Sequence, residues 1–372
     1  MRELINGAEA ISRAALDAGC DFFAGYPITP ATPILIDMVR ELPLLGGTAI
    51  QAEDEIAAIG MCIGAALGGK RVLTATSGPG MSLYSENIGL AIMGEVPMVI
   101  IDCQRMGPAT GAATTTSQGD IQFLRWGTSG GYPLIVLAPA SVEDCYSCTL
   151  RAFMLSERYR VPVIVATDKE TVSAYATVDV EHLKGAAVPP RERLGRNTPY
   201  HIFNPESPSE VLPLADMSTH IIRFNTSSHD PTGYLTKDPT QLTELNSHLE
   251  MKILEQRIDL EWYAYEQDQG AHTLMISYGI SAGSMLEAAS ILRQEGHPVA
   301  ILTLKSIWPV PEAILRQALG TAETILVIEM NNGQYLREIE RLCRTDQAIR
   351  SVCSLSGELI SPDDILKEGG FR

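Results

Sequence analysis

Three carboxylates stand in a row where a short apolar segment gives way to a run of small residues. Glu53, Asp54 and Glu55 follow residues 48–51 and precede small apolar residues that run to Gly69. Acidic side chains in the first turn of a helix complement the positive end of its dipole, which explains two of the three without a function. The third could face inward and hold a proton for a reaction.

Further polar groups follow three other apolar runs, in segments 26–30, 76–80 and 103–108. Ligands of open parallel sheets bind at the carboxyl ends of the strands, so these loops and the carboxylates are expected at one edge. The planar guanidinium of Arg105 could pair there with a substrate carboxylate, although an arginine at this place often forms an ion pair or lies on the rim. Thr29 lies between two prolines, where a threonine is also explained by its preference for turns.

Common ligand motifs are incomplete in this sequence. Gly78-Pro-Gly80 lacks the third glycine of a dinucleotide fingerprint, because Leu83 stands in its place. The Cys145-x-x-Cys148 pair lies in a helical pattern without a second pair, which favours buried helix cysteines over a metal site. No metal ligands are therefore expected in this chain. His220 and His229 fall in an irregular stretch and are expected at the surface.

Strands and helices alternate along the first 170 residues. Apolar runs predict strands at 21–25, 48–51, 71–75, 97–102, 134–137 and 161–166. Helices are predicted after the carboxylates and at 6–19, 31–42, 81–93, 120–126 and 141–159, with Asn6 and Glu9 forming a capping box and Ser141 a cap. This alternation predicts an α/β domain with a parallel sheet covered on both faces.

The alternation breaks at about residue 171 and resumes at 273. Residues 171–269 are richer in proline, histidine and charge, with one helix predicted at 251–266. We predict a domain at 1–170, an irregular connector at 171–269 that crosses a surface of this chain or of a partner, and a smaller α/β domain at 270–372. In this last part, strands are predicted at 273–277, 299–304 and 324–329, and helices at 281–295, 311–319 and 334–342.

Composition excludes some functions. The chain has 372 residues and a formal net charge of −17, which argues against a nucleic-acid footprint and against a basic patch for membrane surfaces. No signal peptide pattern opens the sequence, and its apolar runs are too short to span a bilayer. Seven cysteines, an odd number, are typical of a reduced protein, so a cytoplasmic location is expected.

Four segments together carry a resemblance: Gly25-Tyr-Pro-Ile-Thr-Pro30, Glu53-Asp-Glu-Ile-Ala57, Thr74-Ala-Thr-Ser-Gly-Pro-Gly80 with Glu86-Asn87, and Gln104-Arg-Met-Gly-Pro108. In this order they resemble the alpha subunit of the thiamine-diphosphate-dependent 2-oxoacid:ferredoxin oxidoreductases, closest to the 2-oxoglutarate type. The resemblance is strong over residues 1–170 and continues through 273–342, including Glu329-Met-Asn-Asn-Gly-Gln334. It implies a pyrimidine-binding domain followed by a domain like the carboxyl-terminal domain of transketolase.

The resemblance also implies roles for single residues. Glu55 matches the family's activating glutamate, which hydrogen-bonds a ring nitrogen of the cofactor's aminopyrimidine and favours the tautomer that takes a proton from the thiazolium carbon. Thr29 and Arg105 match residues near the substrate carboxylate. Ser77 and Gly78, together with Pro27 and Ile28, would line the cofactor. The cofactor supplies the decarboxylation chemistry, and the protein supplies placement and a proton relay.

The sequence holds only half of such a site. It contains no Gly-Asp-Gly for the Mg²⁺ that binds the diphosphate, and no cysteine cluster for a [4Fe–4S] centre. The family pattern places Mg²⁺ and the iron–sulfur cluster in a beta subunit, and it implies a gamma subunit as well. Reduced ferredoxin, or a ferredoxin-like delta subunit, would take the electrons, and coenzyme A would take the acyl group.

Two other functions stay open at this point. One is a subunit of a non-oxidative thiamine-dependent decarboxylase, which the second α/β domain disfavours, and the other is a non-catalytic scaffold subunit. The set of Thr29, Glu55 and Arg105 argues against a scaffold. Met106 stands where the family commonly has glycine, and Ala109 also departs from it, so the choice of 2-oxoacid stays open beside the best expectation of 2-oxoglutarate.

Overall fold

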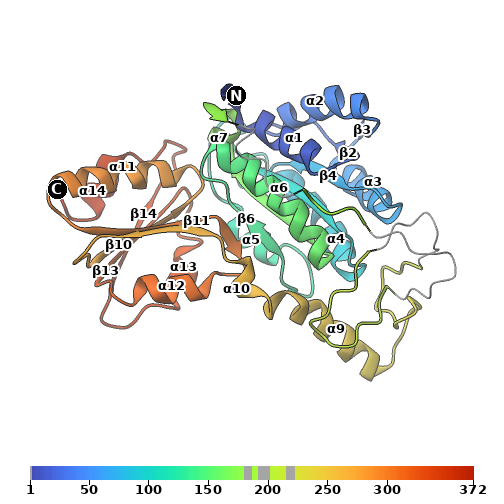
Figure 1. The fold of residues 1–372 in the computed structure, drawn as a ribbon. Helices are drawn as coiled ribbons and strands as arrows, with labels where there is room; N and C mark the ends of the chain where they lie inside the picture. Colours follow the sequence, from blue (N-terminus) through green and yellow to red (C-terminus); the bar gives the residue numbers. More distant parts are fainter. Residues whose placement is uncertain (1, 180–186, 192–201, 215–222) are drawn as a thin grey trace.

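The computed structural model describes residues 2–179, 187–191, 202–214 and 223–372. Within these residues the strands form two large sheets, each in its own α/β unit, and a two-stranded ribbon (Figure 1). The predicted α/β class with parallel sheets is confirmed. The limits that we predict for the domains stay predictions.

The first sheet has the strand order β12-β6-β7-β5-β4-β2-β3. Its strands are β2 (Phe22–Gly25), β3 (Thr48–Gln51), β4 (Val72–Thr76), β5 (Met98–Gln104), β6 (Ile135–Leu137), β7 (Pro162–Asp168) and β12 (Ser306–Trp308). All neighbours pair in parallel except β12, which is antiparallel to β6. Every residue of β4, β5 and β7 is buried, which explains their continuous apolar runs.

Helices cover this sheet on both faces. They are α1 (Gly7–Asp17), α2 (Thr32–Glu41) with the 3₁₀ turn η1 (Leu42–Leu45), α3 (Glu55–Leu67), α4 (Gly78–Met93), α5 (Ile121–Trp126) and α6 (Val142–Tyr159). Helix α1 packs on α2 and α6, while α3 packs on α4. The capping box of Asn6 with Glu9 and the cap by Ser141 are confirmed. Cys145 and Cys148 are buried in α6, as expected.

The stretch after the first unit contains more regular structure than we expected. Helix α7 (Lys169–Ser173) leads into β8 (Tyr175–Asp179), which pairs with β1 (Arg2–Asn6), and further along lie α9 (Pro239–Leu254), α10 (Arg257–Leu260) and β9 (Tyr263–Gln267). The single helix predicted at 251–266 is wrong. Asp238 caps α9 with Pro239 in its first turn, so the helix begins earlier, and the last residues pair with β11 instead.

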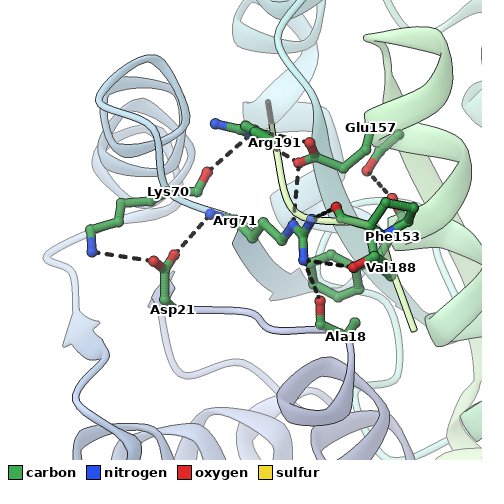
Figure 2. Close-up of polar contacts among 10 residues, drawn as sticks. Ala18, Asp21, Lys70, Arg71, Phe153, Glu157, Val188 and Arg191 are labelled. Carbon is green, nitrogen blue, oxygen red and sulfur yellow. Dashed lines mark hydrogen bonds and ion pairs between the residues drawn. The ribbon is translucent and has the colours of Figure 1, made fainter. Parts of the chain in front are cut away.

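A network of arginines fastens part of this stretch to the first unit (Figure 2). Arg71, just before β4, donates to the backbone oxygens of Ala18 (3.1 Å) and Val188 (3.3 Å). Arg191 donates to both carboxylate oxygens of Glu157 on α6, each at 2.9 Å. Because a bidentate arginine–carboxylate pair fixes direction as well as distance, residues 187–191 are held against α6.

A buried ion cluster fastens α9 to the turn after α4. Glu95 accepts from Lys252 Nζ and His248 Nε2, each at 2.9 Å, and lies 3.8 Å from Arg160. Burial alone would raise the pKa of Glu95, but the charges of Arg160 and Lys252 hold it well below its ordinary value. Glu95 therefore stays ionised and ties two distant segments of the chain together.

The expectation that His229 lies at the surface is wrong. The residue is 2% exposed, and its ring packs at a tilt of 53° against the ring of Phe203, with 4.3 Å between the centroids. Burial lowers the pKa of His229, which keeps the imidazole neutral near pH 7. His220 lies outside the described residues.

The second unit is built on the strand order β14-β13-β10-β11-β9, with β9 antiparallel to its neighbour and the others parallel. The strands are β10 (Thr273–Tyr278), β11 (Val299–Leu304), β13 (Thr324–Glu329) and β14 (Ala348–Cys353), and the helices are α11 (Ser281–Gln294), α12 (Glu312–Leu319), α13 (Leu336–Glu340) and α14 (Pro362–Glu368). The sequence did not predict β14 or α14. None of the helices in the described ranges is long and apolar enough to cross a membrane.

Candidate active site

The three adjacent carboxylates are not equivalent in the structure. Glu55, the first residue of α3, is buried with 7% of its surface exposed, whereas Glu53 and Asp54 are exposed. Asp54 caps α3 by accepting from the backbone N–H of Ala57 at 2.7 Å. Glu55 alone is therefore turned into the protein. Its role as a catalytic residue stays a prediction.

Glu55 lies against the start of α4. A Cβ atom placed on Gly80 would collide with the Thr76 hydroxyl and would lie 2.9 Å from Glu55 Cγ. The hydroxyl oxygens of Thr76 and Ser77 are buried and have no hydrogen-bond partner in the described part of the chain. A buried carboxylate, two unpaired hydroxyls and a glycine that leaves room form a suitable surface for a polar aromatic ring.

A buried hydroxyl pair lies behind this group. The Tyr84 hydroxyl and the Thr74 hydroxyl are 2.7 Å apart, and both side chains are fully buried. Burial raises the pKa of Tyr84, so the phenol stays protonated at any working pH. Glu55 is near enough for its charge to add to the rise in the pKa of Tyr84.

Arg105 and Thr29 meet, although they lie in different loops. Arg105 Nη1 donates to the backbone oxygen of Thr29 at 2.6 Å, and Nη2 donates to the backbone oxygen of Thr110 at 3.1 Å. Arg105 is buried, and its Nε has no partner among the described residues. A guanidinium that two carbonyls hold in place, with its Nε–H unpaired among the described residues, is a preorganised site for an anion.

The remaining predicted residues lie around these two groups. Ile28 packs partly against the core, and its carbonyl accepts from Thr32 N at 2.9 Å; Pro27 is half-buried beside it. Ser77 stands at the N-cap position of α4 and Gly78 is the helix's first residue. All of them lie at the carboxyl ends of the strands, as we expect for one sheet edge.

A cavity of about 590 Å³ opens between the two units. From the first unit it is lined by Gly78, Pro79, Ser82, residues 105–109, Ser117, Gly119, Asp120 and Phe123, and from the second by Asn331, Asn332, Gln334 and Leu355. Of the predicted site residues, Arg105 and Gly78 line this cavity, whereas Glu55 and Thr29 are not among its lining residues. The cavity is large enough for a small organic acid.

Gln118 fastens the cavity loop to the second unit. Its Oε1 accepts from Met330 N (2.9 Å) and Ser281 Oγ (3.1 Å), and its Nε2 donates to the Tyr278 carbonyl (2.9 Å). The backbone of Gln118 adds a bond to the Met330 carbonyl at 2.9 Å. Every polar atom of this buried amide side chain is thus paired across the boundary between the units.

Sequence reasoning missed two carboxyls beside the cavity. Asp102 is fully buried in β5, and Asp120 precedes α5 with its carboxyl 3.0 Å from where a Cβ on Gly78 would lie. Asp102 could have been noticed in the sequence, because it stands inside a run of apolar residues and a buried carboxyl requires a polar partner. The partner could not be found from the sequence, because 17 residues, 103–119, separate the two positions.

Comparisons with known proteins agree with this architecture. Residues 13–229 match the family described as pyruvate flavodoxin/ferredoxin oxidoreductase, thiamine diphosphate-binding, and residues 271–365 match pyruvate:ferredoxin oxidoreductase core domain II. The 2-oxoglutarate synthase subunit KorA of Methanothermobacter thermautotrophicus is 38% identical over 97% of this chain and 96% of its own length. The ketoisovalerate oxidoreductase subunit VorB of the same organism is 34% identical over 98% of this chain and 96% of its own length.

Solved structures show the same fold. The 2-oxoglutarate:ferredoxin oxidoreductase of Magnetococcus marinus, with 2-oxoglutarate, coenzyme A and succinyl-CoA bound, superposes with a TM-score of 0.89 and 29% identity, over 100% of this chain and 65% of that chain. An inactive tetramer of a split-gene transketolase superposes with a TM-score of 0.56 at 11% identity, over 99% of this chain and 97% of that chain, which is a likeness of fold alone.

Proposed function

This chain belongs to the pyruvate flavodoxin/ferredoxin oxidoreductase family, and we propose that it is the alpha subunit of an enzyme that oxidatively decarboxylates 2-oxoglutarate. With coenzyme A, the products are an acyl-CoA, CO₂ and reduced ferredoxin. The observation that carries this proposal is the sequence similarity to the 2-oxoglutarate synthase subunit KorA, which extends over 97% of this chain. The Magnetococcus marinus structure supports it, because 2-oxoglutarate, coenzyme A and succinyl-CoA are bound in that protein.

Thiamine diphosphate fits the residues around the start of α4. The buried Glu55 carboxylate would accept a hydrogen bond from the aminopyrimidine ring, and the Ser77 hydroxyl, which has no partner among the described residues, would meet its polar edge. Gly78, Pro27 and Ile28 would line the ring. When bound, the cofactor supplies the acidic carbon at which 2-oxoacids are decarboxylated. Glu55 would hold a ring nitrogen of the bound cofactor by a hydrogen bond, so this chain's share of the chemistry would be a proton relay through that carboxylate.

The substrate carboxylate would bind at Arg105. Two of its nitrogens are held by the Thr29 and Thr110 carbonyls, and Nε is left with no partner in the described part of the chain. Thr29 would add its hydroxyl from the adjacent loop, where its side chain is exposed. Because the fork is fixed before substrate arrives, little conformational entropy is lost on binding.

The rest of the active site would come from partner chains. The sequence has no Gly-Asp-Gly, so a beta subunit would bind the diphosphate through Mg²⁺, and the same subunit would carry the [4Fe–4S] cluster. A gamma subunit, and a ferredoxin or ferredoxin-like delta subunit as electron acceptor, complete the proposed assembly. We place the complex in the cytoplasm.

Two substitutions in the same turn test the proposal. In the reconstituted complex, Glu55→Gln is expected to lower 2-oxoglutarate-dependent reduction of a viologen dye by about 100-fold or more, because the neutral amide cannot relay the proton. Glu53→Gln is the matched control and should keep the activity, since Glu53 is exposed. Native mass spectrometry would check that both variants assemble. Equal activity of the Glu55→Gln and wild-type complexes would overturn the assignment.

Offering other 2-oxoacids to the same complex tests the choice of substrate. The enzyme is expected to prefer 2-oxoglutarate over 2-oxoisovalerate and pyruvate in kcat/KM. A preference for 2-oxoisovalerate would instead place the chain with the ketoisovalerate oxidoreductases, to which it is also similar.

A further inference from the structure

Asp102 and Asp120 face each other beside the cavity. Neither oxygen of the Asp102 carboxyl meets an N–H or hydroxyl group in the described part of the chain, and the same is true of Asp120 Oδ2. The two carboxyls lie close enough together for a hydrogen bond between them to contribute to both of their pKa values. Since an oxygen–oxygen hydrogen bond needs a proton, one member of the pair must be a carboxylic acid.

Their surroundings decide which member carries this proton. Asp102 is fully buried in β5, and both burial and the charge of Asp120 raise its pKa well above the ordinary value. For Asp120, burial raises the pKa to about 6, although the hydrogen bond from Asp102 and the charge of Arg105 both act to lower it. Asp102 is therefore the neutral donor, and Asp120 is the member that titrates.

Asp120 and Arg105 are the charged side chains among the residues that line the cavity. The second unit contributes the neutral amides of Asn331, Asn332 and Gln334 to the same wall. From β5, Asp102 faces Asp120, and at the start of α4 a Cβ placed on Gly78 would lie only 3.0 Å from Asp120 Oδ2. The charge of Arg105, and of any anion that binds there, therefore acts on the pKa of Asp120 together with its burial and the hydrogen bond from Asp102.

We propose that Asp120 takes up a proton from solvent when an anionic 2-oxoacid binds at Arg105, with Asp102 as the positioning residue that holds Asp120 in place. This inference rests on the proposed function, which puts the substrate carboxylate at Arg105. A bound carboxylate neutralises the guanidinium that helps keep Asp120 ionised, and it adds a like charge nearby. Both changes favour the protonated form of Asp120.

The sign of the pH dependence follows from this linkage. A group that is more easily protonated in the complex makes binding tightest below its pKa in the free protein, here about 6. Binding then weakens as the pH rises toward the higher pKa of the complex. Because one pKa unit of linked shift corresponds to a tenfold change in affinity, we expect the substrate affinity to fall by about tenfold between pH 6 and pH 8.

Calorimetry on the intact complex tests the proposal without turnover. The probe is 2-hydroxyglutarate, which carries both carboxylates but lacks the reactive carbonyl. Titrations at pH 7 in buffers of different ionisation enthalpy give the number of protons taken up per bound molecule. The wild-type complex is expected to take up a substantial fraction of one proton at pH 7, and almost none at pH 5, where Asp120 is already protonated.

Two isosteric variants separate the roles of the pair. Asp120→Asn removes the titrating group and should abolish proton uptake and flatten the pH dependence of affinity. In Asp102→Asn, the introduced amide donates to Asp120 as the carboxylic acid does, so proton uptake should persist. Wild-type binding without proton uptake, or uptake unchanged in Asp120→Asn, would overturn the proposal. If a variant does not assemble, the wild-type titrations still show whether binding takes up a proton.

A third variant keeps this inference separate from the proposed function. Arg105→Lys is expected to weaken binding of 2-hydroxyglutarate, because lysine cannot reproduce the bidentate fork. Equal binding by Arg105→Lys and wild type would refute the substrate site itself. Weakened binding combined with no proton uptake in the wild type would refute only the role of Asp120.

Discussion

Replacing Gln118 with leucine is expected to loosen the cavity loop from the second unit. The substitution keeps the approximate size of a side chain that is 1% exposed, but it removes all three of its side-chain hydrogen bonds. The Met330 N–H and the Tyr278 carbonyl, which are hydrogen-bonded to the Gln118 amide in the wild type, would stay buried without that partner. Leucine therefore lowers the free energy of unfolding, although it is about as large as glutamine, because it leaves buried polar groups unpaired.

The size of the effect follows from the number of bonds lost. A buried polar group that loses its partner costs about 1–3 kcal/mol, so the three bonds together are expected to cost about 3 kcal/mol or more. The opening of the loop would then be about 100-fold more frequent, since each 1.4 kcal/mol is a factor of ten. Because the same loop carries Arg105 and Asp120, KM for the 2-oxoacid should rise as well.

Hydrogen–deuterium exchange of the assembled complex measures this opening directly. Peptides that cover residues 115–124 and 330–336 should exchange about 100-fold faster in Gln118→Leu. Ser117→Ala is the matched control, because it removes one hydrogen bond to the Met330 carbonyl while Gln118 N–H still donates to that oxygen. Exchange in Gln118→Leu that matched the control would refute the reasoning that the amide holds the two units together.

Two further substitutions test the packing and the charges described above. Gly80→Ala places a methyl group against Glu55, so we expect about 1–3 kcal/mol of strain. Thiamine diphosphate should then bind about tenfold more weakly, as measured by fluorescence titration. The control is Gly283→Ala in α11, whose new methyl group would meet no atom within 4 Å and which should bind the cofactor normally. Glu95→Gln leaves the buried cations around it without a counter-charge and is expected to cost about 3–5 kcal/mol, seen as a lower Tm of the complex. In the wild type, the contribution of Glu95 to the free energy of unfolding should be complete above the ordinary glutamate pKa of 4.5. This contribution should be lost as the pH falls toward the depressed pKa of Glu95 in the folded protein, because protonation then favours the unfolded chain.

Periodicity predicted the elements that are long and regular, and it failed where tertiary pairing decides. The strand β12 has only three residues, Ser306–Trp308, and it exists because β6 offers an open edge. The segment Tyr263–Gln267 looked like the end of a helix, but the edge of β11 makes it a strand. Short segments carry too little local preference to determine their structure without such a neighbour.

The inward position of Glu55 could have been read from the sequence. The buried residues of α3 are Glu55, Ala58, Ile59, Cys62, Ile63 and Ala66, so the glutamate lies on the same stripe as the apolar side chains. Glu53 and Asp54 precede the helix and do not share this stripe. The helix phase, and not the number of negative charges, distinguishes the three carboxylates.

The segment Glu329–Gln334 explains why the second unit is needed at a site built mostly from the first. The buried Glu329 carboxylate accepts from Tyr335 N and Leu336 N, each at 3.0 Å, and so fixes the turn between them. That turn presents Asn331, whose amide donates to the Gln118 carbonyl at 2.8 Å, and Gln334, whose amide donates to the Gly119 carbonyl at 2.6 Å. Asp120 is the next residue in the chain. The position of the titrating carboxyl therefore depends on a buried glutamate in the other unit, and a disturbance at Glu329 should reach the substrate cavity without any change in the first sheet.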